Sequence, residues 1–126
     1  MKSLLLVATG GAAGAAARHL LSQASMRWLG PAWPYGTMAA NILGSLLMGA
    51  LAGWLAYKVD GGRDLRLFLG VGLLGGFTTF SAFSLETALM IERKQFASAG
   101  FYAAGSVILC LMALFAGLYL ARKAFA

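Results

Sequence analysis

Charged side chains are scarce in this sequence. Its 126 residues include ten lysines and arginines, four acidic residues and a single histidine, so charged residues make up 11% of the chain. A soluble domain carries about 25%. With 60% hydrophobic residues and a mean hydropathy of +0.79, so few charges cannot cover a water-facing surface. These values exclude a disordered chain and an ordinary soluble enzyme, and they indicate an integral membrane protein.

Cysteine is almost absent as well. The single Cys110 has no partner for an internal disulfide, which excludes a disulfide-stabilised secreted scaffold. The sequence also lacks spacings typical of metal ligands, of a Ser/His/Asp triad or of a phosphate-binding loop. We therefore expect no enzyme. Because Cys110 lies inside an apolar run, we expect its thiol to act as a small core residue.

Long apolar runs are what the sequence does contain. Stretches without any charged residue cover positions 3–17, 28–57, 67–85 and 95–121. A membrane-spanning helix needs about 20 residues, so the sequence predicts a single all-α transmembrane domain. Its four helices are expected at about 3–24, 35–57, 66–93 and 97–121 of the domain 1–126. The runs are continuous and do not alternate, which argues against a β-barrel.

The start of the chain allows a second interpretation. Lys2, the apolar residues 4–7 and the alanines at 15–17 together resemble a cleaved signal peptide. The apolar core of such a peptide would be short and interrupted by Gly10 and Gly11. The remainder of the chain is membrane-bound under either interpretation.

The basic residues are distributed almost evenly between the two ends of the predicted helices. With four spans, six of them share a side with both termini, namely Lys2, Lys58, Arg63, Arg66, Arg122 and Lys123. Four belong to the other connections, namely Arg18, Arg27, Arg93 and Lys94. Under the positive-inside rule, so small a difference is compatible with insertion in both orientations. Because these charges flank apolar spans, they indicate lipid head groups and not nucleic acid as their partners.

Glycines recur at the spacing of close helix packing. The segments 10–14 and 72–76 both begin and end with glycine, which gives GxxxG pairs inside apolar runs. A nucleotide-binding loop would need a preceding strand and a following lysine. Gly49 and Gly53 continue a stripe of small residues on the second helix, and from this stripe we expect an oligomer, most simply a dimer.

Polar residues inside the predicted spans are costly in lipid and therefore mark candidate functional positions. On the second helix Thr37, Asn41 and Ser45 recur every four residues and form one stripe. Asn41 is either a hydrogen-bond clamp between helices or part of a polar path, and the sequence leaves both interpretations open.

The fourth predicted helix carries a second polar stripe. Tyr102, Ser106 and Cys110 also repeat every four residues, a pattern that suits interhelical hydrogen bonding as well as a pathway. Glu86 is the one carboxylate near the membrane interior. It pairs either with Arg18 or with a group at the membrane interface, and the sequence does not decide between them.

The third predicted helix contains the densest signal, the segment GGFTTFSAFS at 75–84. Adjacent glycines and adjacent threonines are poor helix formers, so we expect this span to break in mid-membrane at about 75–79. Carbonyls freed by such a break are natural cation ligands. Phe80 and Phe83 share one face, where they either pack or turn their electropositive ring edges toward a small anion.

These segments carry a family resemblance. The residues at 75–84 resemble the signature of the CrcB/Fluc family of fluoride ion channels. The segments GGAAGAAAR at 10–18 and GTMAANILGS at 36–45 resemble its first-helix and second-helix motifs, and the length and four-span layout are similar over the whole chain. The sequence departs from the family at His19, where an aromatic residue is usual, and at Cys110, where a hydroxyl is common.

The resemblance implies an antiparallel, dual-topology homodimer in the cell membrane, with two pores that passively export toxic fluoride from the cytoplasm. It also implies a structural sodium ion held by the backbone carbonyls of Gly75 and Thr78 from each subunit. Arg18 matches a basic residue that attracts anions at a vestibule. The implied fluoride pathway consists of Asn41, Phe80, Phe83, Tyr102 and Ser106, with hydroxyl groups from Thr37, Ser81 and Ser84.

Two other functions explain parts of the pattern. A small four-helix multidrug/proton antiporter also inserts in both orientations, but it needs a carboxylate in its first helix, and residues 3–17 contain none. A non-transporting membrane subunit would explain the glycine stripes. It would not explain two glycines and two threonines at a break beside phenylalanines.

Overall fold

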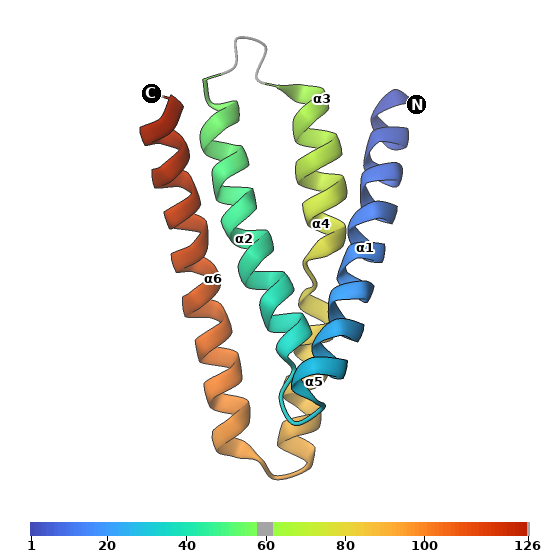
Figure 1. The fold of residues 1–126 in the computed structure, drawn as a ribbon, viewed down its shortest axis with the longest axis vertical. Helices are drawn as coiled ribbons and strands as arrows, with labels where there is room; N and C mark the ends of the chain where they lie inside the picture. The colour runs from blue at the N-terminus through green and yellow to red at the C-terminus, as the bar shows by residue number, and fades with distance from the viewer. Residues whose placement is uncertain (58–61, 126) are drawn as a thin grey trace.

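The computed structural model describes residues 1–57 and 62–125, and all regular structure in this part of the chain is helical (Figure 1). The elements are α1 (Lys2–Leu29), α2 (Tyr35–Leu55), α3 (Arg63–Leu65), η1 (Arg66–Leu74), α4 (Gly75–Phe77), α5 (Phe80–Glu92) and α6 (Phe96–Phe125). Four helical stretches are long and apolar enough to cross a membrane, since α3, η1, α4 and α5 together form one candidate span. The protein is therefore a multi-pass membrane protein built of helices. Lys58, which the comparison of basic residues counts with the termini, lies outside the described residues.

The helix ends differ from the predicted positions by a few residues. α1 continues to Leu29, five residues past the expected end, and stops where Gly30 has a φ of 83° and donates its N–H to the Met26 carbonyl. Glycine adopts a positive φ without the steric cost that other residues meet, which explains why the helix ends there. At the other end of the chain, α6 continues to Phe125 instead of residue 121. Both termini lie at the same end of the bundle (Figure 1).

Glycine contacts hold the helices close together. Gly10 and Gly14 of α1 face the backbone of η1 and α4, where added Cβ atoms would meet the carbonyls of Phe68 and Leu73. Gly72 and Gly76 face the backbone of α1 in return. The GxxxG pairs at 10–14 and 72–76 thus pack against each other, as the spacing predicts.

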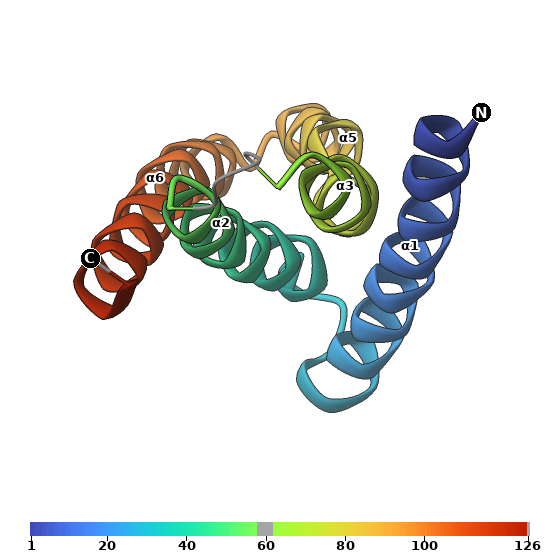
Figure 2. The same cartoon turned by 90° about the horizontal axis from the view of Figure 1, so that it is seen from above.

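The stripe of Gly49 and Gly53 packs inside the chain. A Cβ at Gly49 would meet the Leu114 carbonyl of α6, and one at Gly53 would lie 2.8 Å from the Ala121 Cβ. These glycines let α2 and α6 approach each other closely. The expectation that this stripe forms an oligomer contact was therefore wrong, because its small residues are already used within one protomer. Seen from above, α2 lies beside α6, while α1 lies at the opposite edge of the molecule (Figure 2).

The helical backbone is interrupted between α4 and α5 (Figure 1). Thr78 has φ and ψ of −85° and 156°, and Thr79 has −151° and 120°, so both are extended. Thr79 caps α5, since its Oγ1 accepts a hydrogen bond of 3.1 Å from the N–H of Ala82. The preceding η1 is a π-helix, and the N–H of Gly75 donates to the carbonyl of Gly70. π-Helical backbone is rare and is concentrated at functional sites.

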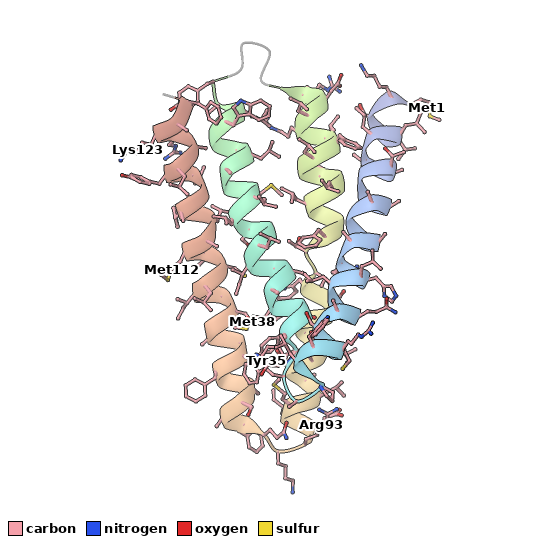
Figure 3. All side chains as sticks on the ribbon, in the orientation of Figure 1. Met1, Tyr35, Met38, Arg93, Met112 and Lys123 are labelled. Carbon is pink, nitrogen blue, oxygen red and sulfur yellow. The ribbon has the colours of Figure 1, made fainter. Side chains whose placement is uncertain are left out.

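Many side chains on the outer surface are apolar. Figure 3 shows Met112 pointing away from the other helices, and on the same helix α6 the rings of Phe101 and Phe115 are exposed. An apolar outer surface of this kind suits contact with lipid. The buried residues form two clusters, one around Leu55 and one around Tyr102.

Candidate functional site

A groove with a volume of about 300 Å³ lies between α2, the interruption, α5 and α6. The polar side chains that line it are Asn41, Ser45, Thr78, Thr79, Ser106 and Cys110. Its apolar part includes Phe80 and Phe83, the two phenylalanines of the segment at 75–84. Asn41 and Ser45 of the predicted second-helix stripe and Ser106 and Cys110 of the fourth-helix stripe therefore line the same groove, together with the interruption in the third span.

The side chain of Asn41 forms hydrogen bonds with the backbone of the interruption. Its Oδ1 accepts a hydrogen bond of 2.7 Å from the N–H of Thr79, and its Nδ2 donates one of 3.1 Å to the Thr79 carbonyl. Both polar ends of the amide are thus engaged, and one N–H of the Nδ2 group remains for another partner. Asn41 is the hydrogen-bond clamp that the sequence allowed, and it lies on the groove as well.

Ser106 provides an unused donor in the groove. Only 5% of its surface is exposed, and its Oγ has no hydrogen-bond partner among the residues that the structure describes. A buried hydroxyl without a partner is costly, and native proteins retain few of them. Ser106 also lines the groove, so its unpaired hydroxyl lies next to the space that a polar ligand would occupy.

Aromatic rings continue from the groove into the protein. The centroids of Phe80 and Phe83 are 5.5 Å apart, those of Phe83 and Tyr102 5.2 Å, and those of Tyr102 and Trp33 5.6 Å. The first two pairs are tilted and the third is edge-to-face, so none is stacked in parallel. The series runs from Phe80, which is 77% exposed, to Tyr102, which is fully buried. Tilted rings direct electropositive edges toward their surroundings.

Beyond the rings lies a second, smaller hollow of about 80 Å³. Thr37 and Glu86 line it, together with Ser22 and Ser25 from the end of α1. The Tyr102 hydroxyl donates a hydrogen bond of 3.2 Å to Glu86 Oε1, and Glu86 also interacts with Thr37.

The sequence left Arg18 or a group at the membrane interface as the partner of Glu86. The structure pairs Glu86 with Tyr102 and Thr37 instead. Arg18 binds the Gly76 carbonyl. The isolation of Glu86 as a carboxylate near an apolar run was the available signal, but the pairing with Tyr102 depends on how α5 packs against α6.

The interruption leaves specific backbone carbonyls without their usual helical donors. In a continuous helix the N–H of Thr79 would pair with the Gly75 carbonyl, and that of Ala82 with the Thr78 carbonyl. Here these N–H groups donate to Asn41 Oδ1 and to Thr79 Oγ1. Carbonyl oxygens are suitable ligands for a hard cation. The chemistry of this donor set therefore fits the sodium ion that the family resemblance implies.

The chain matches the CrcB family, described as "CrcB-like protein, Camphor Resistance (CrcB)", over residues 5–118. It belongs to this family. Proteins named "Fluoride-specific ion channel FluC" are similar to it along their full length. The one from Phenylobacterium zucineum is 64% identical, the one from Caulobacter vibrioides 56% and the one from Hyphomonas neptunium 54%, each with both chains completely covered.

In this CrcB-family chain most of the predicted site residues lie at the two hollows. The larger one collects Asn41, Phe80, Phe83 and Ser106, and the smaller one collects Thr37, with Tyr102 between them. The side chains of Ser81 and Ser84 are exposed on α5 and are outside both linings. The Ser81 hydroxyl lies 3.2 Å from Thr79 Oγ1. Arg18 contacts the interruption, since its Nε donates a hydrogen bond of 3.2 Å to the Gly76 carbonyl.

Proposed function

We propose that this protein is a fluoride-selective passive ion channel that exports toxic fluoride from the cytoplasm across the cell membrane. The observation that carries the proposal is similarity over the whole chain to proteins named fluoride-specific ion channel FluC. The groove supports it, because a largely apolar hollow with the unpaired Ser106 hydroxyl in its lining suits a small anion. The protein is thus a channel and not an enzyme.

Fluoride is small and strongly hydrated, so a pore has to replace its water molecules with other donors. The Ser106 hydroxyl, the free N–H of Asn41 and the ring edges of Phe80 and Phe83 are the groups that do so in the groove. Tyr102 and Thr37 continue the pathway toward the smaller hollow. Each partner is weak by itself, and conduction requires weak serial sites because an anion held by a full positive charge would not leave.

The functional unit is an antiparallel homodimer with two pores. Phe80 is 77% exposed and the groove is open on one side in a single chain, so a second copy is needed to enclose the pathway. The weak difference between the basic residues of the two ends is compatible with insertion of the two copies in opposite orientations. The pore-lining roles of Ser81 and Ser84, which are exposed on α5, also depend on this second copy.

A structural sodium ion would be held by both subunits at the broken third span. The interruption at Thr78 and Thr79 falls near the centre of the candidate span Arg63–Glu92, which corresponds to mid-membrane. The carbonyls of Gly75 and Thr78 from each copy would hold the ion, because their helical donors are engaged elsewhere. When bound, sodium supplies positive charge that fixes these carbonyls, and it is not transported.

The test is release of anions from liposomes that contain only the purified protein, followed with a fluoride-selective electrode. We expect rapid release of fluoride and no comparable release of chloride. Equal rates for the two anions would refute selectivity, and no release above protein-free liposomes would refute the channel. A multidrug antiporter is disfavoured, because α1 contains no carboxylate to exchange protons for a cation.

A further inference from the structure

In the central part of α1, one face of the helix packs against the third span. Gly10, Gly14 and Arg18 are spaced by four residues and therefore lie on the same face of the helix. Gly10 and Gly14 bring the α1 backbone against η1 and α4, and the N–H of Phe77 lies 2.8 Å from where a Cβ of Gly14 would be. One turn further along, Arg18 is the first long side chain on this face.

Arg18 reaches the last turn of α4. Its Nε donates a hydrogen bond of 3.2 Å to the carbonyl of Gly76, across 58 residues of sequence. The final carbonyls of a helix have no partner within it, and together they carry partial negative charge. A cation at this position both satisfies one carbonyl and complements the end of the helix.

Arg18 and Asn41 thus hold the two sides of the interruption. Asn41 fixes the backbone of Thr79 on the side of α5, and Arg18 fixes the Gly76 carbonyl on the side of α4. The Thr78 carbonyl lies between these two attachments in the sequence, and the Gly75 carbonyl comes directly before Gly76; the helical donors of both are engaged elsewhere. The clamps come from different helices, α1 and α2, so they also tie the interruption to the rest of the bundle.

We propose that Arg18 is a positioning residue for the interrupted third span, which holds Gly76 so that the carbonyls of Gly75 and Thr78 are presented to a cation. This inference deepens the proposed function and rests on it where it concerns sodium. It differs from a role for Arg18 as a general positive charge that attracts anions at a vestibule. A positioning role depends on the fixed direction of the N–H groups of the planar guanidinium, whereas the lysine ammonium is a compact charge with rotatable donors on a flexible stem. A vestibule charge would be retained by lysine.

The experiment compares Arg18→Lys and Arg18→Gln with the wild-type dimer, using Arg27→Lys and Arg27→Gln as matched controls. Arg27 is an exposed arginine in the last turn of the same helix. The first readout is hydrogen–deuterium exchange of the amides of residues 75–82. The second is the sodium concentration at which thermal stability is half restored after removal of the ion, and fluoride release from liposomes is the third.

We expect both Arg18 variants to exchange at least about tenfold faster at residues 75–82, the factor that corresponds to about 1.4 kcal/mol for one charge-assisted hydrogen bond. The sodium midpoint should rise by about the same factor in both, and the Arg27 variants should match the wild type.

Wild-type exchange in Arg18→Lys, with loss of fluoride release only in Arg18→Gln, would overturn the proposal in favour of a vestibule charge. Faster exchange with an unchanged sodium midpoint would contradict the link to the cation. If the wild type itself releases no fluoride, the proposed function fails, while the exchange rates still decide whether Arg18 positions the interruption.

Discussion

The side chain of Asn41 and the backbone of Thr79 form two hydrogen bonds in opposite directions, of 2.7 and 3.1 Å. The amide of Asn41 thereby takes the place of the helical partners that Thr79 lacks. This contact joins α2 to the point where the third span is extended, and it faces the groove. The same residue therefore stabilises the interruption and borders the proposed fluoride pathway.

Replacement of this amide should destabilise the protein. Asn41→Ala leaves the N–H and carbonyl of Thr79 without these partners, so we expect the free energy of unfolding to fall by about 1–3 kcal/mol. Ser45→Ala, one turn further along the same stripe, is the control and should change it by less than about 0.5 kcal/mol. Equal stability of the Asn41 variant and the control would contradict the clamp. Reversible unfolding in mild detergent provides the measurement.

Replacement of Ser106 should lower fluoride release without lowering the stability of the protein. Because its buried hydroxyl has no partner in the described chain, Ser106→Ala should leave stability unchanged or slightly higher. Fluoride release should fall by about tenfold, as expected when an anion loses one hydrogen bond. The control is Thr87→Ala, whose hydroxyl donates to the Phe83 carbonyl at 2.8 Å and faces its own helix. Unaltered release in Ser106→Ala would remove this hydroxyl from the pathway.

The phenylalanine rings provide a third test. In Phe80→Ile and Phe83→Ile the apolar volume is largely kept but the electropositive ring edge is lost. We expect fluoride release to fall by about three- to tenfold while the dimer persists, because ring-edge contacts contribute about 0.5–1.5 kcal/mol. Phe101→Ile on α6, where the ring is 76% exposed, should conduct like the wild type. Normal release in both groove variants would limit these rings to a packing role.

A substitution at Gly75 tests whether two copies of the chain form a sodium-dependent dimer. A Cβ at this position would be 3.5 Å from the Gly70 carbonyl, an ordinary contact, so a single chain has room for a side chain there. We expect Gly75→Val to fold but to lose the dimer and its dependence on sodium, because the side chain would occupy the space of the partner and the ion. Gly100→Val, where nothing lies within 4 Å, is the control. Size-exclusion chromatography with and without sodium distinguishes the results, and an intact sodium-dependent dimer in Gly75→Val would argue against this site.

The sequence predicts the number of spans and the packing glycines because both depend on local composition and on helical periodicity. The apolar pattern does not predict where α1 ends, since the helix continues until Gly30, whose positive φ terminates it. The stripe of Gly49 and Gly53 shows a further limit. Small residues predict that another helix packs closely against them, but they do not indicate whether this helix belongs to the same chain.

Side-chain pairing across the bundle was the least predictable feature. Arg18 contacts Gly76 over 58 residues and Tyr102 contacts Glu86 over 16. The first of these depends on close packing of α1 against α4, and the second on the packing of α5 against α6. Spacing along one helix identifies the polar face, as it did for Asn41 and Ser106, but the partner of each group on that face depends on tertiary structure.

The most direct test of the account is fluoride release from liposomes under a potassium diffusion potential set by valinomycin, with equal pH on both sides. A passive channel predicts fast release without any proton gradient, driven by the membrane potential and much slower for chloride. Release that requires a proton gradient, or that does not respond to the potential, would contradict the proposed channel.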